Sequence, residues 1–190
     1  MKFRELKPDE IECRIGTATA KGVSVLLYKT SRTDMAILDE TVGAENWKTS
    51  YEEIRGELFC TLSVRVDGEW IGKQDCGIES KQDDGNEKKA AASDSLKRAG
   101  FLWGIGRELY SSPFIWLGIP TEQRGAKFVP KDRFFVKVAD IEYTDGRISY
   151  LVLVGKDGRE VYHFGKSKDP SAPDFARVAE GQRKREAYAD

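Results

Sequence analysis

Two adjacent cations, Lys97 and Arg98, stand in a segment whose spacing predicts a helix and places them on one face with Phe101. A lysine supplies a point charge, and an arginine supplies a planar fork that matches phosphate oxygens. A row of such contacts gives affinity for nucleic acid that is independent of base sequence and weakens with salt. An aromatic ring one turn further on can stack on a base. Periodicity alone leaves a second interpretation open, a solvated helix face with Phe101 in a subunit interface.

The other side of this predicted helix, which lies between Asn86 and Tyr110, carries small and apolar side chains. Small residues let a helix approach a sheet closely, so we expect this stripe to pack on strands. The stripe consists of Ala92, Ser95, Leu96, Ala99, Leu102 and Trp103. Gly104 and Gly106 follow without a preceding strand or a third glycine, which favours a tight reversal of the chain over a nucleotide-binding loop.

Acidic residues ahead of the helix suggest a rival, enzymatic chemistry. Glu79 and Lys81 have the Glu-x-Lys spacing that, with Asp67 or Asp75, can hold a divalent ion and activate water. Short acidic patterns of this kind often arise by chance, Asp67 falls in a predicted turn, and Asp75 is only four residues ahead of Glu79. We therefore predict no catalytic residue, no metal and no cofactor. A metal-dependent nuclease that uses Glu79 and Lys81 is kept as an alternative.

The composition restricts where a partner can bind. Lysine and arginine total 31 against 32 aspartates and glutamates, so any DNA-binding surface must be local. Three widely spaced cysteines and a single histidine, His163, exclude the common Cys/His zinc patterns, and no serine–histidine pair has supporting spacing. The first residues lack the apolar core of a signal peptide, and no apolar stretch approaches the length of a membrane helix. We expect a soluble, intracellular protein with reduced cysteines.

Turn and capping residues divide the N-terminal part into a hairpin and a short helix. Residues 14–19 and 23–28 flank Ala20, Lys21 and Gly22, which predicts the hairpin. Ser31 and Asp34 have the spacing of a capping box, with Asp in place of the usual Glu or Gln. Gly43 is expected to close the helix predicted over residues 34–42.

Strand patterns follow on both sides of the long helix. Residues 58–65 alternate with a period of two, which predicts a strand with one buried face. An Asp-Gly pair then predicts a hairpin turn into a return strand over residues 69–80. Two further Asp-Gly pairs separate three apolar stretches, which predicts a β-meander over residues 134–164. The expected core or subunit-contact tryptophans are Trp47, Trp70 and Trp103.

Several short motifs follow one another in a fixed order between residues 32 and 110. They are Gly43 with Trp47, Asp67-Gly68-Glu69-Trp70, Asp75-Cys76-Gly77, the run KKAAASDSLKRA from Lys88 to Ala99, and Gly104-Ile105-Gly106-Arg107-Glu108-Leu109-Tyr110. Their joint order and spacing resemble the Rad52 superfamily of single-strand annealing proteins, especially its phage members of the Sak type. The match covers roughly residues 32–110 and, more loosely, the N-terminal hairpin, but it does not extend to the meander after Tyr110.

The resemblance implies an α+β fold with an antiparallel sheet core of the β-β-β-α type, across which a long helix packs, and here a C-terminal β-meander follows. It also implies a ring-forming oligomer whose outer groove holds the DNA backbone inward and the bases outward. In such proteins the Lys-Arg pair of the long helix contacts the DNA backbone, which falls on Lys97 and Arg98. Basic residues before the first helix and in the loop ahead of the second fall on Arg32 and Lys81.

The resemblance does not supply Arg107, and this sequence departs from the family pattern at Phe101. Arg107 stands close behind the helix, and its charge and position alone make it a candidate DNA contact. Phe101 stands where some members carry a further basic residue, so DNA contact there is either weaker or becomes stacking.

These observations predict three segments, which are an annealing core over residues 1–120, a meander extension over 121–165 and a flexible charged tail over 166–190. The expected function is binding of single-stranded DNA and annealing of complementary strands in homologous recombination and double-strand break repair. We expect a phage or prophage protein in the cytoplasm of a bacterial host cell, with no membrane contact. Candidate partners are further copies of the chain and a single-strand-binding protein or recombinase. An oligomeric structural or protein-partner module without DNA affinity is the alternative.

Overall fold

The computed structural model describes residues 1–77 and 87–169, and the chain divides into two compact units. The first unit contains Met1–Leu6 and Lys29–Arg107, and the second contains Lys7–Tyr28 and Glu108–Asp190. The fold is α+β, with antiparallel sheets and, in the described part of the chain, two α-helices. The segment boundaries at residues 120 and 165 stay a prediction.

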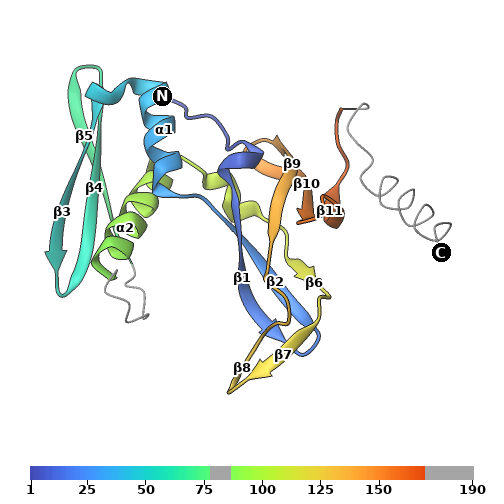
Figure 1. The fold of residues 1–190 in the computed structure, drawn as a ribbon. Coiled ribbons are helices and arrows are strands. Elements are labelled where there is room, and N and C mark those ends of the chain that lie inside the picture. The colour runs from blue at the N-terminus through green and yellow to red at the C-terminus, as the bar shows by residue number, and fades with distance from the viewer. Residues whose placement is uncertain (78–86, 170–190) are drawn as a thin grey trace, which may run out of the picture. The chain divides into compact units, whose positions relative to one another are not determined.

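A three-stranded antiparallel sheet forms the base of the first unit. Its strands are β3 (Trp47–Ile54), β4 (Glu57–Val66) and β5 (Glu69–Cys76), in the order β3-β4-β5. Helix α2 (Glu87–Trp103) runs along β4 and β5 (Figure 1). Because α2 covers one face, buried residues alternate along β4, which confirms the predicted period of two.

Two tight turns set the register of this sheet. Asp67 and Gly68, with φ of 51° and 89°, join β4 to β5 and confirm the predicted hairpin. Arg55 and Gly56, with φ of 56° and 84°, join β3 to β4 in the same way. Two successive positive φ values match the right-handed twist of the flanking strands. The second turn was not predicted, because arginine is a poor turn signal and β3 is largely polar.

Helix α1 (Ser31–Val42) begins earlier than its sequence suggests. Thr30, not Ser31, is the N-cap residue, and its side-chain oxygen accepts a hydrogen bond from the backbone N–H of Thr33. The predicted capping box is therefore wrong, and Asp34 is instead fully buried. Gly43 ends the helix at φ 85°, and its N–H donates to the carbonyl of Asp39, as expected of a helix-closing glycine.

The buried side of α2 differs from the predicted stripe. Ser95, Leu96 and Ala99 are buried as expected, but Leu102 is 39% exposed and Ala91 takes the buried place given to Ala92. The reason is that α2 is packed on two sides, by the sheet and by α1. A single apolar stripe describes a helix that is packed on one side only. The predicted stripe therefore misplaces the buried face of α2, which is turned toward both the sheet and α1.

The chain reverses tightly after α2, as predicted. Gly104 and Gly106 have φ of 101° and 72°, which glycine adopts without a steric penalty. The N–H of Ile105 donates to the carbonyl of Gly100, and its side chain is fully buried. The first unit also contains a 3₁₀ turn, η2 (Ala44–Asn46).

The second unit consists of strands and short 3₁₀ turns, η1 (Pro8–Glu10) and η3 (Arg107–Ser111), the latter beginning at the boundary of the units. The predicted N-terminal hairpin is confirmed and gains a third strand, giving the order β1-β2-β6. The predicted meander is confirmed in the order β11-β10-β9, and β7 and β8 form a separate hairpin. The strands are β1 (Glu12–Thr19), β2 (Gly22–Tyr28), β6 (Ile115–Leu117), β7 (Thr121–Arg124), β8 (Lys127–Pro130), β9 (Val136–Thr144), β10 (Arg147–Gly155) and β11 (Glu160–Gly165).

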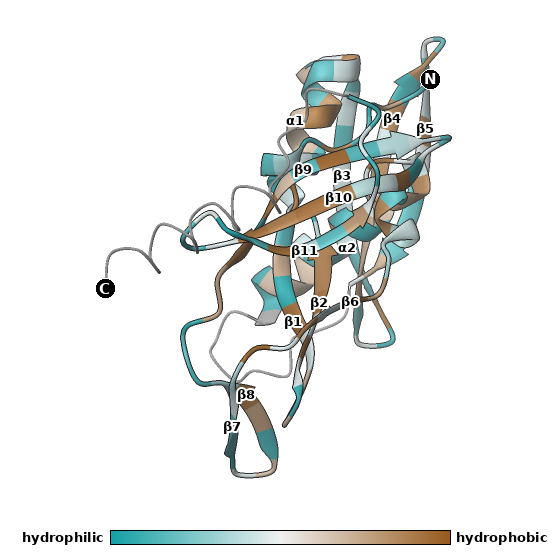
Figure 2. Cartoon of the chain, turned by 90° about the vertical axis from the view of Figure 1, so that its right-hand side faces the viewer, coloured by the Kyte–Doolittle hydropathy of each residue, from teal (hydrophilic) through white to brown (hydrophobic). Residues whose placement is uncertain are grey.

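Strand β10 is the centre of the meander. Its five consecutive residues from Tyr150 to Val154 are all buried, and Figure 2 shows much of the strand coloured as hydrophobic. A strand buried on both faces has a continuous apolar run in place of alternation. Tyr150, Val152 and Val154 form one apolar cluster, with Ala139 of β9 packed against it.

Candidate nucleic-acid interface

Lys97 lies on the partly exposed side of α2. Its ammonium forms an ion pair with Asp94, one turn earlier, at 3.0 Å, and its side chain is 25% exposed. Ion pairs of this kind on a helix contribute only about 0.3–0.5 kcal/mol. A phosphate can therefore share or replace the Asp94 carboxylate at little cost, so Lys97 is available for a backbone contact.

Arg98 is held in a fixed direction by the neighbouring strand. Its Nε donates to Oδ1 of Asp75 on β5 at 3.2 Å, and its side chain is 41% exposed. Asp75 in turn accepts a hydrogen bond from the N–H of Cys76. Within the described residues the two terminal nitrogens of Arg98 donate no hydrogen bond, so the fork keeps donors for a phosphate.

Phe101 has a partner inside the first unit. The ammonium of Lys29 lies 4.2 Å from the centre of the Phe101 ring, and the ring is half-buried. This cation–π contact explains an aromatic residue beside two cations without a nucleic-acid base. Stacking of Phe101 on DNA stays a prediction.

Arg107 closes the end of α2. Its Nε and Nη2 donate to the carbonyl of Phe101 at 3.1 and 2.8 Å, and Nη2 also donates to the carbonyl of Leu102 at 2.9 Å. The last carbonyls of a helix lack partners within it, and a cation there is favourable. The guanidinium thus has a capping role, and its contact with DNA stays a prediction.

Arg107→Ala is expected to lower the melting temperature by a few degrees, because two helix carbonyls lose charged donors at a cost of about 1 kcal/mol. Thermal unfolding followed by circular dichroism measures the change. Arg124→Ala is the matched control, since Arg124 is an exposed arginine that forms an ion pair with Glu122 on its own hairpin strand. An unchanged melting temperature together with a tenfold loss of DNA affinity would contradict the capping role and assign the side chain to DNA.

The remaining predicted contacts are not brought to the Lys97–Arg98 pair by any described interaction. Arg32 is the second residue of α1, is exposed, and forms no ion pair within the described residues. Lys81 lies outside the described residues, and so does Glu79 of the nuclease alternative. Of the acidic residues in that alternative, Asp67 stands in the β4–β5 turn and Asp75 binds Arg98. Residues 1–77 and 87–169 contain no cluster of three His, Cys, Asp or Glu that can hold a metal.

Two further cations of the sheet were not predicted. Lys73 of β5 donates to the carbonyl of Leu102 at 2.9 Å and lies 4.5 Å from the Trp103 ring. Lys48 of β3 lies 4.4 Å from the ring of Trp70, which is 41% exposed, so Trp70 is not in the core and its expected alternative role as a subunit contact stays a prediction. Cross-strand neighbours depend on register, which residue spacing along one strand does not contain.

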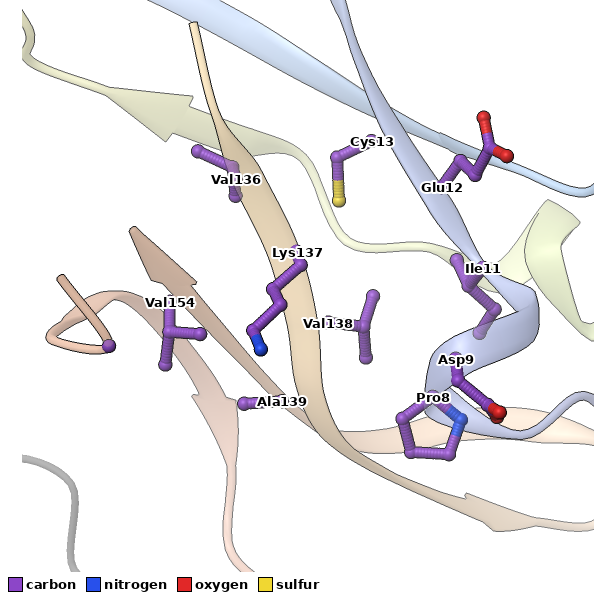
Figure 3. A pocket seen from close by; sticks show the side chains of 11 residues that line it. Pro8, Asp9, Ile11, Glu12, Cys13, Val136, Lys137, Val138, Ala139 and Val154 are labelled. Atoms are coloured by element: carbon purple, nitrogen blue, oxygen red, sulfur yellow. The ribbon is translucent and has the colours of Figure 1, made fainter. Parts of the chain in front are cut away.

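The second unit contains a cavity of about 830 Å³ between η1, β1, β9 and β10. Figure 3 shows its lining, which is mainly aliphatic and includes Cys13 and Lys137. Burial, with a smaller effect of Glu12, raises the pKa of the Cys13 thiol to about 12. The thiol therefore stays protonated at neutral pH and is a poor nucleophile. None of the predicted DNA contacts lines this cavity.

The chain matches the family described as Rad52/22 family double-strand break repair protein over residues 3–124. It is 32% identical over 92 residues to the single-stranded DNA-binding protein DdrA of Deinococcus radiodurans, covering 48% of this chain and 44% of that protein. It is 35% identical over 78 residues to the single-stranded DNA-binding protein DdrA of Deinococcus deserti, covering 41% of this chain and 38% of that protein. The chain thus spans less than half the length of these relatives. No solved structure matches it significantly.

The first unit is an antiparallel sheet with a long helix packed along it, and that helix carries the partly exposed cation pair Lys97 and Arg98. The family match covers more than half of the chain, and the protein therefore belongs to the Rad52/22 family of double-strand break repair proteins. This confirms the resemblance seen in the order of the short motifs. In the described residues, no helix is long and apolar enough to cross a membrane.

Proposed function

We propose that this chain binds single-stranded DNA along its phosphate backbone and anneals complementary strands in homologous recombination and double-strand break repair. The observation that carries the proposal is the pair Lys97 and Arg98, which are neighbours on α2, are partly exposed, and each form an ion pair with a partly exposed carboxylate. Membership of the Rad52/22 family and the likeness to single-stranded DNA-binding proteins support it.

Annealing by such a surface requires no covalent step. Lys97 and Arg98 neutralise phosphates, which lowers the repulsion between two DNA backbones. Backbone contacts tolerate any sequence, so the bases stay free to test a complementary strand. Arg32, exposed at the start of α1, is proposed as a further phosphate contact, and Lys81 and Arg107 complete the proposed set.

A ring of copies is part of the proposal. The net charge of the chain is −1, and one copy offers only a few phosphate contacts. A few such contacts bind weakly at physiological salt, whereas repeated contacts on one strand raise the overall affinity through effective concentration. Assembly into a ring arranges the cation pairs of successive copies along one DNA strand.

Lys97→Ala and Arg98→Ala are each expected to weaken binding to an oligo-dT strand about tenfold, the cost of a charge-assisted hydrogen bond. Each contact to a single strand contributes about 0.7 to the slope of log affinity against log salt, so the double variant should lose about 1.4 from that slope. Fluorescence anisotropy between 50 and 200 mM salt, in the range where binding is measurable, gives both values. Annealing of complementary oligonucleotides should slow in parallel.

Lys156→Ala is the matched control, because it removes an exposed cation from a turn of the second unit. It should bind DNA as the unchanged chain does. If Lys97→Ala and Arg98→Ala both keep full affinity and the full salt slope, the site assignment is wrong. If the unchanged chain shows no salt-dependent binding, the proposed function itself fails and a protein-partner module is favoured.

A further inference from the structure

Lys29 and Asp34 form an ion pair inside the first unit. Their side chains are 1% and 0% exposed. Lys29 directly precedes Thr30, the N-cap of α1, and Asp34 lies in the first turn of that helix. Removing two charges from water costs several kcal/mol per ion, so a buried pair is weak support for stability by itself. The pair therefore calls for another explanation.

The ammonium of Lys29 connects α1 to α2, the helix that carries Lys97 and Arg98. Besides Asp34, it donates to the backbone carbonyl of Lys97 at 3.1 Å. It also lies 4.2 Å from the centre of the Phe101 ring, one turn further along α2. In an α-helix the Lys97 carbonyl already accepts one hydrogen bond within the helix, and its second lone pair takes the ammonium. Lys29 thus binds the backbone of the residue that we place on DNA.

Two glycines show that α2 and the turn after it are packed tightly against the Lys29–Asp34 pair. A Cβ on Gly100 of α2 would lie 2.6 Å from Oδ1 of Asp34 and 3.3 Å from the ammonium of Lys29. A Cβ on Gly106 would lie 2.6 Å from Cδ of Lys29. The backbone of α2 and of the turn behind it is therefore packed directly on the pair, and a shift of the helix toward α1 is blocked.

From these contacts we infer that Lys29 and Asp34 are positioning residues that fix the turn of α2 carrying Lys97 and Arg98 in its DNA-binding orientation. This inference rests on the proposed function. Lys97 and Asp34 also act on each other electrostatically, since burial raises the pKa of Asp34 to about 6 while Lys29, and less strongly Lys97, oppose the rise. The pair thus contacts the backbone of Lys97 and exerts a weaker electrostatic effect on its ammonium.

The variant that tests this is Lys29→Met with Asp34→Leu, because methionine and leucine keep the shape of the two side chains and leave no charge buried. Affinity for an oligo-dT strand is expected to fall several-fold. The slope of log affinity against log salt should fall by about 0.7, the share of one phosphate contact. A purely structural role would lower the folded fraction but leave the salt slope of the folded protein unchanged.

A double-mutant cycle with Lys97→Ala gives the decisive comparison. If the pair acts through Lys97, the loss of affinity caused by the paired substitution should disappear in the Lys97→Ala background. Arg4→Met with Glu40→Gln is the control, since it removes a partly exposed ion pair in which Glu40 belongs to α1. It should change neither affinity nor salt slope.

Gly100→Ala provides a second variant that keeps every charge. Its added methyl group has to push Asp34 or the helix aside, so the same loss of affinity and salt slope is expected. Full affinity in both the paired variant and Gly100→Ala, or a loss that persists in the Lys97→Ala background, overturns the inference. If Lys97→Ala alone changes neither the affinity for oligo-dT nor the salt slope, the proposed DNA site is wrong, and this result is distinct from a failure of the Lys29–Asp34 inference.

Discussion

Lys29→Met is expected to lower the free energy of unfolding by about 3–5 kcal/mol, the typical cost of removing one partner from a buried ion pair. Asp34 is fully buried, and its Oδ2 has no hydrogen-bond partner among residues 1–77 and 87–169. Without Lys29 the carboxylate loses its opposing charge and its hydrogen bond together. Urea unfolding followed by tryptophan fluorescence measures the loss, because Trp47 and Trp103 belong to the same unit.

The pH dependence of this variant follows from the direction of the Asp34 pKa. Burial raises that pKa above 3.8, and Lys29 is the main influence that opposes the rise. In Lys29→Met the folded protein therefore holds a proton on Asp34 that the unfolded chain has already released. The contribution of Asp34 to stability is then greatest below its unfolded-state pKa of 3.8 and is lost as pH rises through its folded-state pKa. Lys29→Met with Asp34→Leu should recover most of the lost stability and show no such fall. A single variant as stable as the paired one at pH 7 would contradict the buried-charge argument.

Local patterns were sufficient to predict the elements that depend on neighbouring residues. The alternation in residues 58–65 identified β4, and Asp-Gly pairs located two hairpin turns, because a two-residue turn requires positive φ values that these residues tolerate. The meander followed from the same signals. Strand β3 was missed because most of its residues are polar and exposed, so no buried face marks it.

The candidate site was predictable only in part, because some of its contacts join residues that are distant in the sequence. Lys97 and Arg98 are neighbours in the chain, so a helical period places them together. Lys29 and Lys97 are separated by 68 residues, and no local pattern reveals their contact. Asp34 shows how a local signal misleads. Its spacing from Ser31 fits a capping box, but in the folded protein its carboxylate forms an ion pair with Lys29.

Gly77→Ala is expected to destabilise the first unit by about 3 kcal/mol and to weaken DNA binding. A Cβ at this position would lie 2.2 Å from the carbonyl oxygen of Ala91 and 2.8 Å from the backbone nitrogen of Ser95. Gly77 follows β5 and donates its N–H to the carbonyl of Leu58, so it cannot move without leaving the sheet. The helix must move instead, which shifts Arg98 from Asp75. Urea unfolding and oligo-dT anisotropy measure the two effects.

The clash at Gly77 is with backbone atoms, and this makes the prediction specific. Trimming the facing side chain with Ala91→Gly should not rescue Gly77→Ala, because the carbonyl oxygen stays in place. Gly118→Ala is the matched control, since a Cβ there meets nothing within 4 Å, and its stability should change by less than about 0.5 kcal/mol. Rescue by Ala91→Gly would mean that helix and strand are separated by side chains. In that case backbone contact does not hold α2 against β5 at the distance that places Arg98 beside Asp75. The orientation of the Arg98 guanidinium would then need another cause.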